Sequence, residues 1–208
     1  MAHDLQLNEQ VLSKGELSNA TQMAKRAFFT DPFFHFLSPN DRLRDRGLTI
    51  FFRANLAHLG EGSRIVTVRD GNDTIQGLAA WLPTGCYPQS VGTQLAQVPG
   101  TLRALYRRPR SLLDGNKYLI ALAKSHPKEA HWYLYLLAVE PSTQRGGAGT
   151  MLMEHGLAHA DEEGAGGYLE TQNEANLAYY RRFGYELRET LRPVKNGPPL
   201  YTMWRRPR

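Results

Sequence analysis

The sequence has a single cysteine, Cys86, among its 208 residues, so no disulfide can form within the chain. A chain of this length buries roughly 70% of the surface that its unfolded form exposes, and it needs no covalent cross-links to fold. A reducing, cytoplasmic setting is therefore expected. No apolar run approaches the ~20 residues that a membrane-spanning helix requires, so no membrane partner is expected.

A strong excess of one charge is also missing, since 25 Lys and Arg stand against 20 Asp and Glu and give a net charge of +5. A solvated surface is the simpler interpretation of this charge, and attraction of a phosphate-bearing ligand or nucleic acid is the other. No recognised nucleic-acid motif accompanies the charge, so no nucleic-acid partner is expected. No His and Cys cluster with metal-ligand spacing stands out, so no metal is expected.

Hydrophobic periodicity and turn signals predict one mixed α/β domain over residues 1–208, built around one sheet. Helices are expected over 13–29, 42–59, about 90–125 (two helices broken at Pro109), 150–163 and 173–183. Strands are expected over 64–69, 74–82, 131–139, 168–171, 185–190 and 200–204, with the apolar strand 131–139 at the centre. The segment between the first two helices is expected to be an aromatic loop bracketed by prolines.

The most informative segment follows the central strand, where Gln144-Arg145-Gly146-Gly147-Ala148-Gly149-Thr150 leads into a helix. Glycines let the backbone approach a ligand closely, and a helix start offers free N–H groups with a partial positive charge. This combination suits a phosphate group, although a plain glycine turn is the alternative. A nucleotide P-loop would need a lysine after the glycines, and a dinucleotide fingerprint would need glycine at Leu152, so neither motif fits.

The pattern Gln144-x-x-Gly147-x-Gly149 between a strand and a helix resembles the acetyl-CoA pyrophosphate loop of the GNAT N-acetyltransferase superfamily. Downstream, Asn173 followed by Tyr180-x-x-x-Gly184-Tyr185 resembles the strand and helix that come next in that superfamily. The runs 125–129, 169–171 and 176–177 are similar to the branch that contains puromycin N-acetyltransferase. The close match covers about residues 125–190.

The resemblance implies a GNAT-like acyl-CoA N-acyltransferase fold, with a central, mostly antiparallel sheet, a splayed parallel strand pair and flanking helices. Residues 1–125 would form the acceptor side, and residues 126–208 would form the acetyl-CoA-binding half with a C-terminal hairpin. Homodimers are common in such families, so a homodimer is an open expectation.

The implied reaction is direct transfer of an acetyl group from acetyl-CoA to an amine. Strand backbone groups would pair with the pantetheine, loop N–H groups would hold the pyrophosphate, and two asparagines would bond the cofactor, although Asn173 is equally well a helix cap. The expected cofactor-binding residues are Leu137, Val139, Gln144, Arg145, Gly146, Gly147, Ala148, Gly149, Thr150, Asn173 and Asn176.

Two residues are expected to act as acid and base. Tyr180 matches the acid tyrosine of the family, and its phenol, with an ordinary pKa near 10, could protonate the departing sulfur. Packing in the core is the alternative for Tyr180. Many members carry a carboxylate base on the strand before the turn, but 131–135 has no acid. Glu170 on the neighbouring strand is the best substitute, His131 is a weaker one, and a structural strand residue is the alternative for Glu170.

The acceptor pocket is expected to use Phe33 and Phe34 from the first loop and Tyr133 and Tyr135 from the central strand, although most of the phenylalanines could be ordinary core. Such a pocket favours a small-molecule amine. A protein lysine or N-terminal acetyltransferase is the second hypothesis. A non-catalytic acyl-CoA-binding regulator is the third, because the strand carboxylate is missing.

Overall fold

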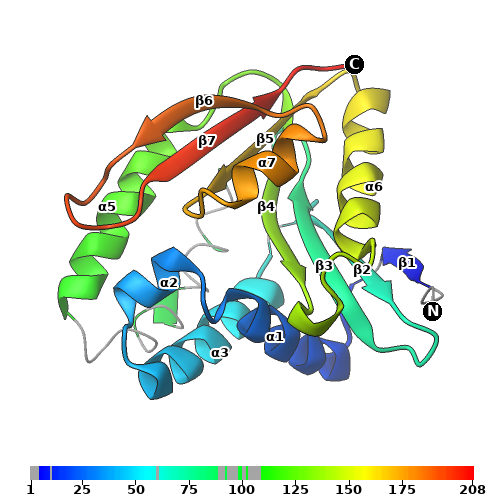
Figure 1. The fold of residues 1–208 in the computed structure, drawn as a ribbon. Helices are drawn as coiled ribbons and strands as arrows, with labels where there is room; N and C mark the ends of the chain where they lie inside the picture. Colours follow the sequence, from blue (N-terminus) through cyan, green and yellow to red (C-terminus); the bar gives the residue numbers. More distant parts are fainter. Residues whose placement is uncertain are drawn as a thin grey trace.

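The protein is described by a computed structural model over residues 5–9, 11–59, 61–88, 92, 98–99, 102 and 109–208. Seven strands form one sheet in the order β1-β2-β3-β4-β5-β7-β6 (Figure 1). The strands are β1 Gln6–Glu9, β2 Arg64–Arg69, β3 Ile75–Leu82, β4 His131–Val139, β5 Gly166–Thr171, β6 Glu186–Leu191 and β7 Leu200–Arg205. β4 and β5 pair in parallel and the other strand pairs are antiparallel, which confirms the mixed sheet and the central place of β4.

Helices cover both faces of this sheet (Figure 1). They are α1 Lys14–Phe28, α2 Pro32–Leu37, α3 Asp41–Ala57, α5 Pro109–Ser125, α6 Ala148–Glu162 and α7 Asn176–Arg181. α1 and α3 bury Met23 and Phe52 against Leu78 of β3 and Ala138 of β4. α6 and α7 bury Leu152 and Leu177 against the other face. None of the described helices is long and apolar enough to cross a membrane.

The expected helix boundaries hold where the capping residues are strong. Ser13 caps α1 in a reciprocal arrangement, in which its hydroxyl accepts from the Glu16 N–H and the Glu16 carboxylate accepts from the Ser13 N–H. The second of the two helices expected within 90–125 is α5, which begins at Pro109. The first of them falls mostly outside the described residues.

Three elements differ from the sequence prediction. The expected aromatic loop is in fact helix α2, because Asp31 caps it and Pro32 suits the first helical position. Strand β1 was missed, since its four residues form a short edge strand against β2. α7 begins at Asn176 rather than 173, because the Asn173 side chain accepts a hydrogen bond from the Ala175 N–H and forms a turn.

The parallel pair separates partway along its length. β4 and β5 are paired from His131 opposite Gly166 to Leu134 opposite Leu169, and the recorded pairing ends there. On the other side of β4, the register against β3 shifts at Tyr135, since Trp81 lies opposite Leu134 and Ala80 opposite Leu136. An extra residue of this kind bends a strand and exchanges its faces. The bulge thus marks the point where β4 leaves β5, and the splayed pair is confirmed.

Candidate active site

The glycine-rich loop between β4 and α6 has the backbone of an anion cradle. Arg145 and Gly147 have positive φ values of 69° and 98°. Gly147 is the N-cap of α6 and provides no side-chain cap, so the N–H groups of the first turn have no intrahelical acceptor. A Cβ placed on Gly147 would meet nothing within 4 Å, so the space beside Gly147 is open.

The start of the loop is tied to neighbouring elements. The Glu140 carboxylate accepts hydrogen bonds from the Arg26 guanidinium of α1, at 2.6 Å from Nη2 and 3.0 Å from Nε. The Thr143 hydroxyl donates to Gln76 Oε1 of β3 at 2.8 Å. Glu140 therefore has a structural role at the end of β4. The loop is held on both sides, and a ligand would find its N–H groups already oriented.

An open hollow of about 490 Å³ lies beside this loop. Gln144 and Pro141 line it from the loop, and Lys25, Arg26 and Phe29 line it from α1. Lys25 is paired with Asp45 at 2.8 Å, so part of the cationic charge is already balanced. Arg26 is paired with Glu140, so each of the two cations that line the hollow already has a carboxylate partner.

Gly149 and Tyr179 meet at the first turn of α6. A Cβ on Gly149 would lie 2.8 Å from the Tyr179 hydroxyl and 3.4 Å from the Val139 side chain, so this position requires glycine. The Tyr179 hydroxyl is buried and has no hydrogen-bond partner among the described residues. Burial raises the pKa of Tyr179 to about 12, so the phenol stays protonated and can donate.

Tyr180 lies in the core on the α6 side of the sheet, 7% exposed. Its ring contacts those of Tyr179 and Tyr185 at centroid distances of 5.3 and 6.3 Å. Burial raises the pKa of Tyr180, and the charges of Tyr179 and Asp31 raise it further. The hydroxyl is therefore protonated at neutral pH. Asp31, at the start of α2, is a nearby carboxylate that sequence reasoning missed.

Glu170 lies on the opposite face of the sheet beside His126, which follows α5. Oε1 of Glu170 is 3.9 Å from Nδ1 of His126, and the two side chains are 5% and 8% exposed. Neither atom has a hydrogen-bond partner among the described residues. Burial raises the pKa of Tyr133 and Tyr168, and the charge of Glu170 raises both further, so the carboxylate faces a cluster of phenols.

The hydrogen bonds of His131 determine which ring nitrogen of a neutral His126 carries no proton. Nδ1 of His131 lies 2.6 Å from the Glu129 carbonyl, which can only accept, so this nitrogen carries the proton. Nε2 of a neutral His131 is then an acceptor, and Nε2 of His126, at 3.0 Å, donates to it. Burial lowers the pKa of His131 and favours this neutral form. Nδ1 of a neutral His126 is left as a lone pair aimed at Glu170.

The four aromatic residues expected in the acceptor pocket fall into two groups. Tyr133 and Tyr135 stand on the Glu170 side, with rings 5.9 Å apart, and Tyr135 donates to Asn55 of α3 at 2.6 Å. Phe34 packs in the core between α1 and α3, and Phe33 packs on Tyr118 of α5 at 4.9 Å. Among the described residues, no ring contact joins Phe33 or Phe34 to Tyr133 or Tyr135.

The remaining expected cofactor residues border the splayed gap and the loop. Leu137 and Val139 lie on β4 beyond the last residue paired with β5. Because of the bulge, they share the α6 face of the sheet with Leu134. Asn176 reaches Thr171 at the end of β5, with 3.4 Å between Nδ2 and Oγ1, so it lies on the far side of the gap.

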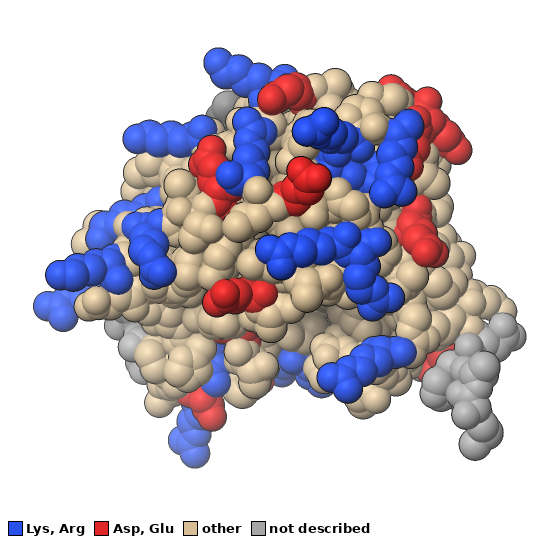
Figure 2. All heavy atoms as spheres, turned by 45° about the horizontal axis from the view of Figure 1, so that its top comes forward, with Lys and Arg blue, Asp and Glu red and all other residues tan. Residues whose placement is uncertain are grey.

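The basic charge shows no single dominant patch on the face drawn in Figure 2. Lys and Arg side chains there are interspersed with Asp and Glu. This distribution favours the interpretation of the net charge as a solvated surface over an extended polyanion-binding face.

Comparisons with known proteins agree with this geometry. Residues 108–185 match the model of the acetyltransferase (GNAT) family. The mycothiol acetyltransferase of Streptomyces coelicolor is 35% identical over 80 residues, which are 37% of this chain and 26% of that protein. The Streptomyces avermitilis enzyme of the same name is 34% identical over the same share of each chain. Residues 108–185 are thus similar to the acetyltransferase (GNAT) family.

Solved structures extend the likeness to the whole fold. A Corynebacterium glutamicum structure, described as histone acetyltransferase HPA2 and related acetyltransferase, has a TM-score of 0.71 at 22% identity and covers 97% of both chains. Arylalkylamine N-acetyltransferase 2 of Aedes aegypti has a TM-score of 0.55 at 12% identity, covering 96% of this chain and 98% of that one. At these identities the likeness establishes the fold. The chain matches only about a quarter of the length of the two mycothiol acetyltransferases.

Proposed function

We propose that this protein is an N-acetyltransferase of the GNAT type that moves an acetyl group from acetyl-CoA to a primary amine of a small molecule. One observation supports this function above the others. An uncapped helix start with an open glycine cradle lies next to a splayed strand pair, and a buried carboxylate, one oxygen of which has no hydrogen-bond partner among the described residues, faces the other side of the sheet.

The glycine cradle offers hydrogen-bond donors that suit the pyrophosphate of acetyl-CoA. The N–H groups of the first turn of α6 would hold the pyrophosphate, and Arg145 would add positive charge. The Tyr179 hydroxyl, buried and without a partner, would complete the set of donors at Gly149. Backbone groups of Leu137 and Val139 would pair with the pantetheine, in place of the pairing that β4 loses beyond Leu134. Acetyl-CoA supplies an activated acetyl thioester.

Acid and base would stand on opposite faces of the sheet. Glu170 would take the proton that the amine nitrogen loses as it bonds to the acetyl carbon. Tyr180 would give its proton to the sulfur as the carbon–sulfur bond breaks. The lone pair on His126 Nδ1 would share the proton that Glu170 has taken. The hydrogen bond between Nε2 of His126 and Nε2 of His131 would then pass positive charge toward the surface.

The nature of the acceptor rests on the groups around Glu170. Tyr133, Tyr135, Tyr168 and Tyr87 are aromatic and mostly buried, so they favour a compact amine with an apolar or planar body. A protein acceptor and a non-catalytic regulator remain the other two hypotheses.

A thiol-release assay with acetyl-CoA over a panel of small amines and lysine peptides tests this proposal. Turnover of at least one small amine, lost in Glu170→Gln, is the expected result. Turnover of peptides alone would move the acceptor class to proteins. Tight acetyl-CoA binding without turnover of any amine or peptide would favour the regulator.

A further inference from the structure

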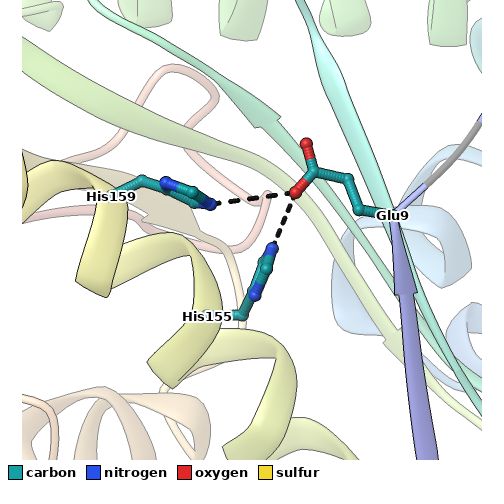
Figure 3. A group of neighbouring side chains, drawn as sticks. All are labelled: Glu9, His155 and His159. Atoms are coloured by element: carbon teal, nitrogen blue, oxygen red, sulfur yellow. Dashed lines mark hydrogen bonds and ion pairs between the residues drawn. The ribbon is translucent and has the colours of Figure 1, made fainter.

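Two histidines on α6 face a glutamate of the edge strand. His155 and His159 are four residues apart, so they lie on the same side of the helix, and Figure 3 shows both imidazoles pointing at the Glu9 carboxylate of β1. The expectation that no histidines have metal-ligand spacing was wrong here. The third group, Glu9, is 146 residues from His155, so the sequence did not reveal the set.

The distances among these groups suit a small tetrahedral ion. Nε2 of His155 is 2.8 Å from Glu9 Oε2, and Nε2 of His159 is 3.8 Å from the same oxygen. All three ligand atoms lie within 4.8 Å of one another. Ligands that bind zinc at about 2.0–2.1 Å in a tetrahedron are roughly 3.3 Å apart, and the two measured distances bracket this value.

The side chains around the cluster hold the ligands in place. The His159 ring stacks on Trp132, with centroids 5.4 Å apart and an angle of 11° between the planes. Its Nδ1 is 3.4 Å from a Glu162 oxygen, so Nε2 is left to face Glu9. A carboxylate behind a metal-binding imidazole is a usual feature of metal sites, because it orients the ring and increases its basicity.

Glu9 keeps one oxygen for a ligand. Its Oε1 accepts from Arg64 at 2.7 Å, whereas Oε2 faces the histidines. The Arg64 charge opposes a cation, so the site favours an ion that binds imidazole strongly over calcium or magnesium.

We propose that Glu9, His155 and His159 bind a divalent transition-metal ion of the zinc type, which clamps β1 to α6. The three side chains are 26–29% exposed, so the ion can enter and a water can occupy the fourth position. β1 is a four-residue strand at the edge of the sheet. The ion would stabilise this strand against the helix that carries the glycine cradle at its other end.

The test uses tag-free protein, stripped with a chelator and dialysed, and titrated with Zn²⁺ by calorimetry and by thermal unfolding. The expected result is one Zn²⁺ per chain and a rise in the unfolding temperature. His155→Asn and His159→Asn should each weaken binding at least about 100-fold, and Glu162→Gln about 10-fold or more. The exposed His35, on α2, provides the control, since His35→Asn should leave binding unchanged.

Circular dichroism must show that each variant is folded. If Glu9→Gln proves unstable because Arg64 loses its partner, the two histidine variants carry the test. Absence of stoichiometric binding by the wild type, or binding that survives in the folded double variant of His155 and His159, would overturn the proposal. Neither readout depends on acetyl transfer.

Discussion

Nδ1 of His126 and Oε1 of Glu170 face each other at 3.9 Å in a buried setting, and neither has another hydrogen-bond partner among the described residues. The Nδ1 lone pair of His126 thus faces the carboxylate that would take the amine proton in the proposed function. It lies on the side of the sheet where Tyr133 and Tyr135 stand.

Substitution of Glu170 by Gln should lower kcat about 100-fold, because the group that takes the amine proton is lost. The loss should shrink for amines of low pKa, which are already neutral at the assay pH. Steady-state kinetics on a series of amines of graded pKa would measure both effects. An equal loss for every amine would show that Glu170 acts by packing.

Substitution of His126 by Asn should lower kcat and leave the KM for acetyl-CoA unchanged, since His126 acts through Glu170. Added imidazole should restore part of the rate, because it can take the proton in place of the missing ring. A purely structural role predicts a change in thermal stability without such rescue, so both quantities should be measured on the same variant.

The adjacent tyrosines of α7 should separate in their kinetic effects. Tyr180→Phe should lower kcat about 100-fold, because the proton for the departing sulfur is lost. Tyr179→Phe should instead raise the KM for acetyl-CoA, because its hydroxyl faces the cradle at Gly149. Each variant is the matched control for the other. A larger kcat effect in Tyr179→Phe would exchange the two roles.

Asp161 and Arg205 provide a prediction about stability and pH. Asp161 accepts two 2.7 Å hydrogen bonds from Arg205, which is 3% exposed. Asp161→Asn should cost about 2 kcal/mol of unfolding free energy in a urea titration, since the buried guanidinium loses a charged partner. Asp114→Asn, in the ion pair with Lys117 on α5, should cost under about 1 kcal/mol.

The same pair has a pH signature. The hydrogen bonds from Arg205 lower the pKa of Asp161 below its usual 3.8. A lowered carboxyl pKa stabilises the fold above the unfolded value, and this contribution disappears as the pH falls through the folded pKa. The stability difference between wild type and Asp161→Asn should therefore shrink below about pH 3.8. A difference that stays constant would mean that the charge of Asp161 contributes nothing.

The sequence predicted those elements whose signals are local. β2, β4 and α1 follow from alternation, an apolar run and the Ser13 cap. β5 begins at Gly166, two residues earlier than expected, because residues 166 and 167 were interpreted as a helix stop. Both glycines pair in the sheet, where a Cβ on Gly166 would lie 2.4 Å from the Trp204 ring. That constraint comes from β7, 38 positions along the chain, and no local pattern reveals it.

The candidate site also has one part with a local sequence signal and another part that depends on distant residues. The glycine cradle is contiguous in sequence, so it could be predicted. The pairing of Glu170 with His126 joins a strand to the end of α5 across 44 positions. The bulge at Tyr135, which decides the faces of Leu137 and Val139, arises from the register with β3 and could not be read from β4 alone.

Calorimetric titration with acetyl-CoA tests the cradle most directly, with wild type compared with Gly147→Glu and Gly164→Glu. Both glycines have positive φ, and a Cβ at either would meet nothing within 4 Å. The two substitutions therefore add the same charge at a strained backbone position, one at each end of α6. We expect binding by wild type and Gly164→Glu, and none by a folded Gly147→Glu. No binding by wild type, or equal binding by all three, would contradict the proposed acetyl-CoA site at the glycine cradle.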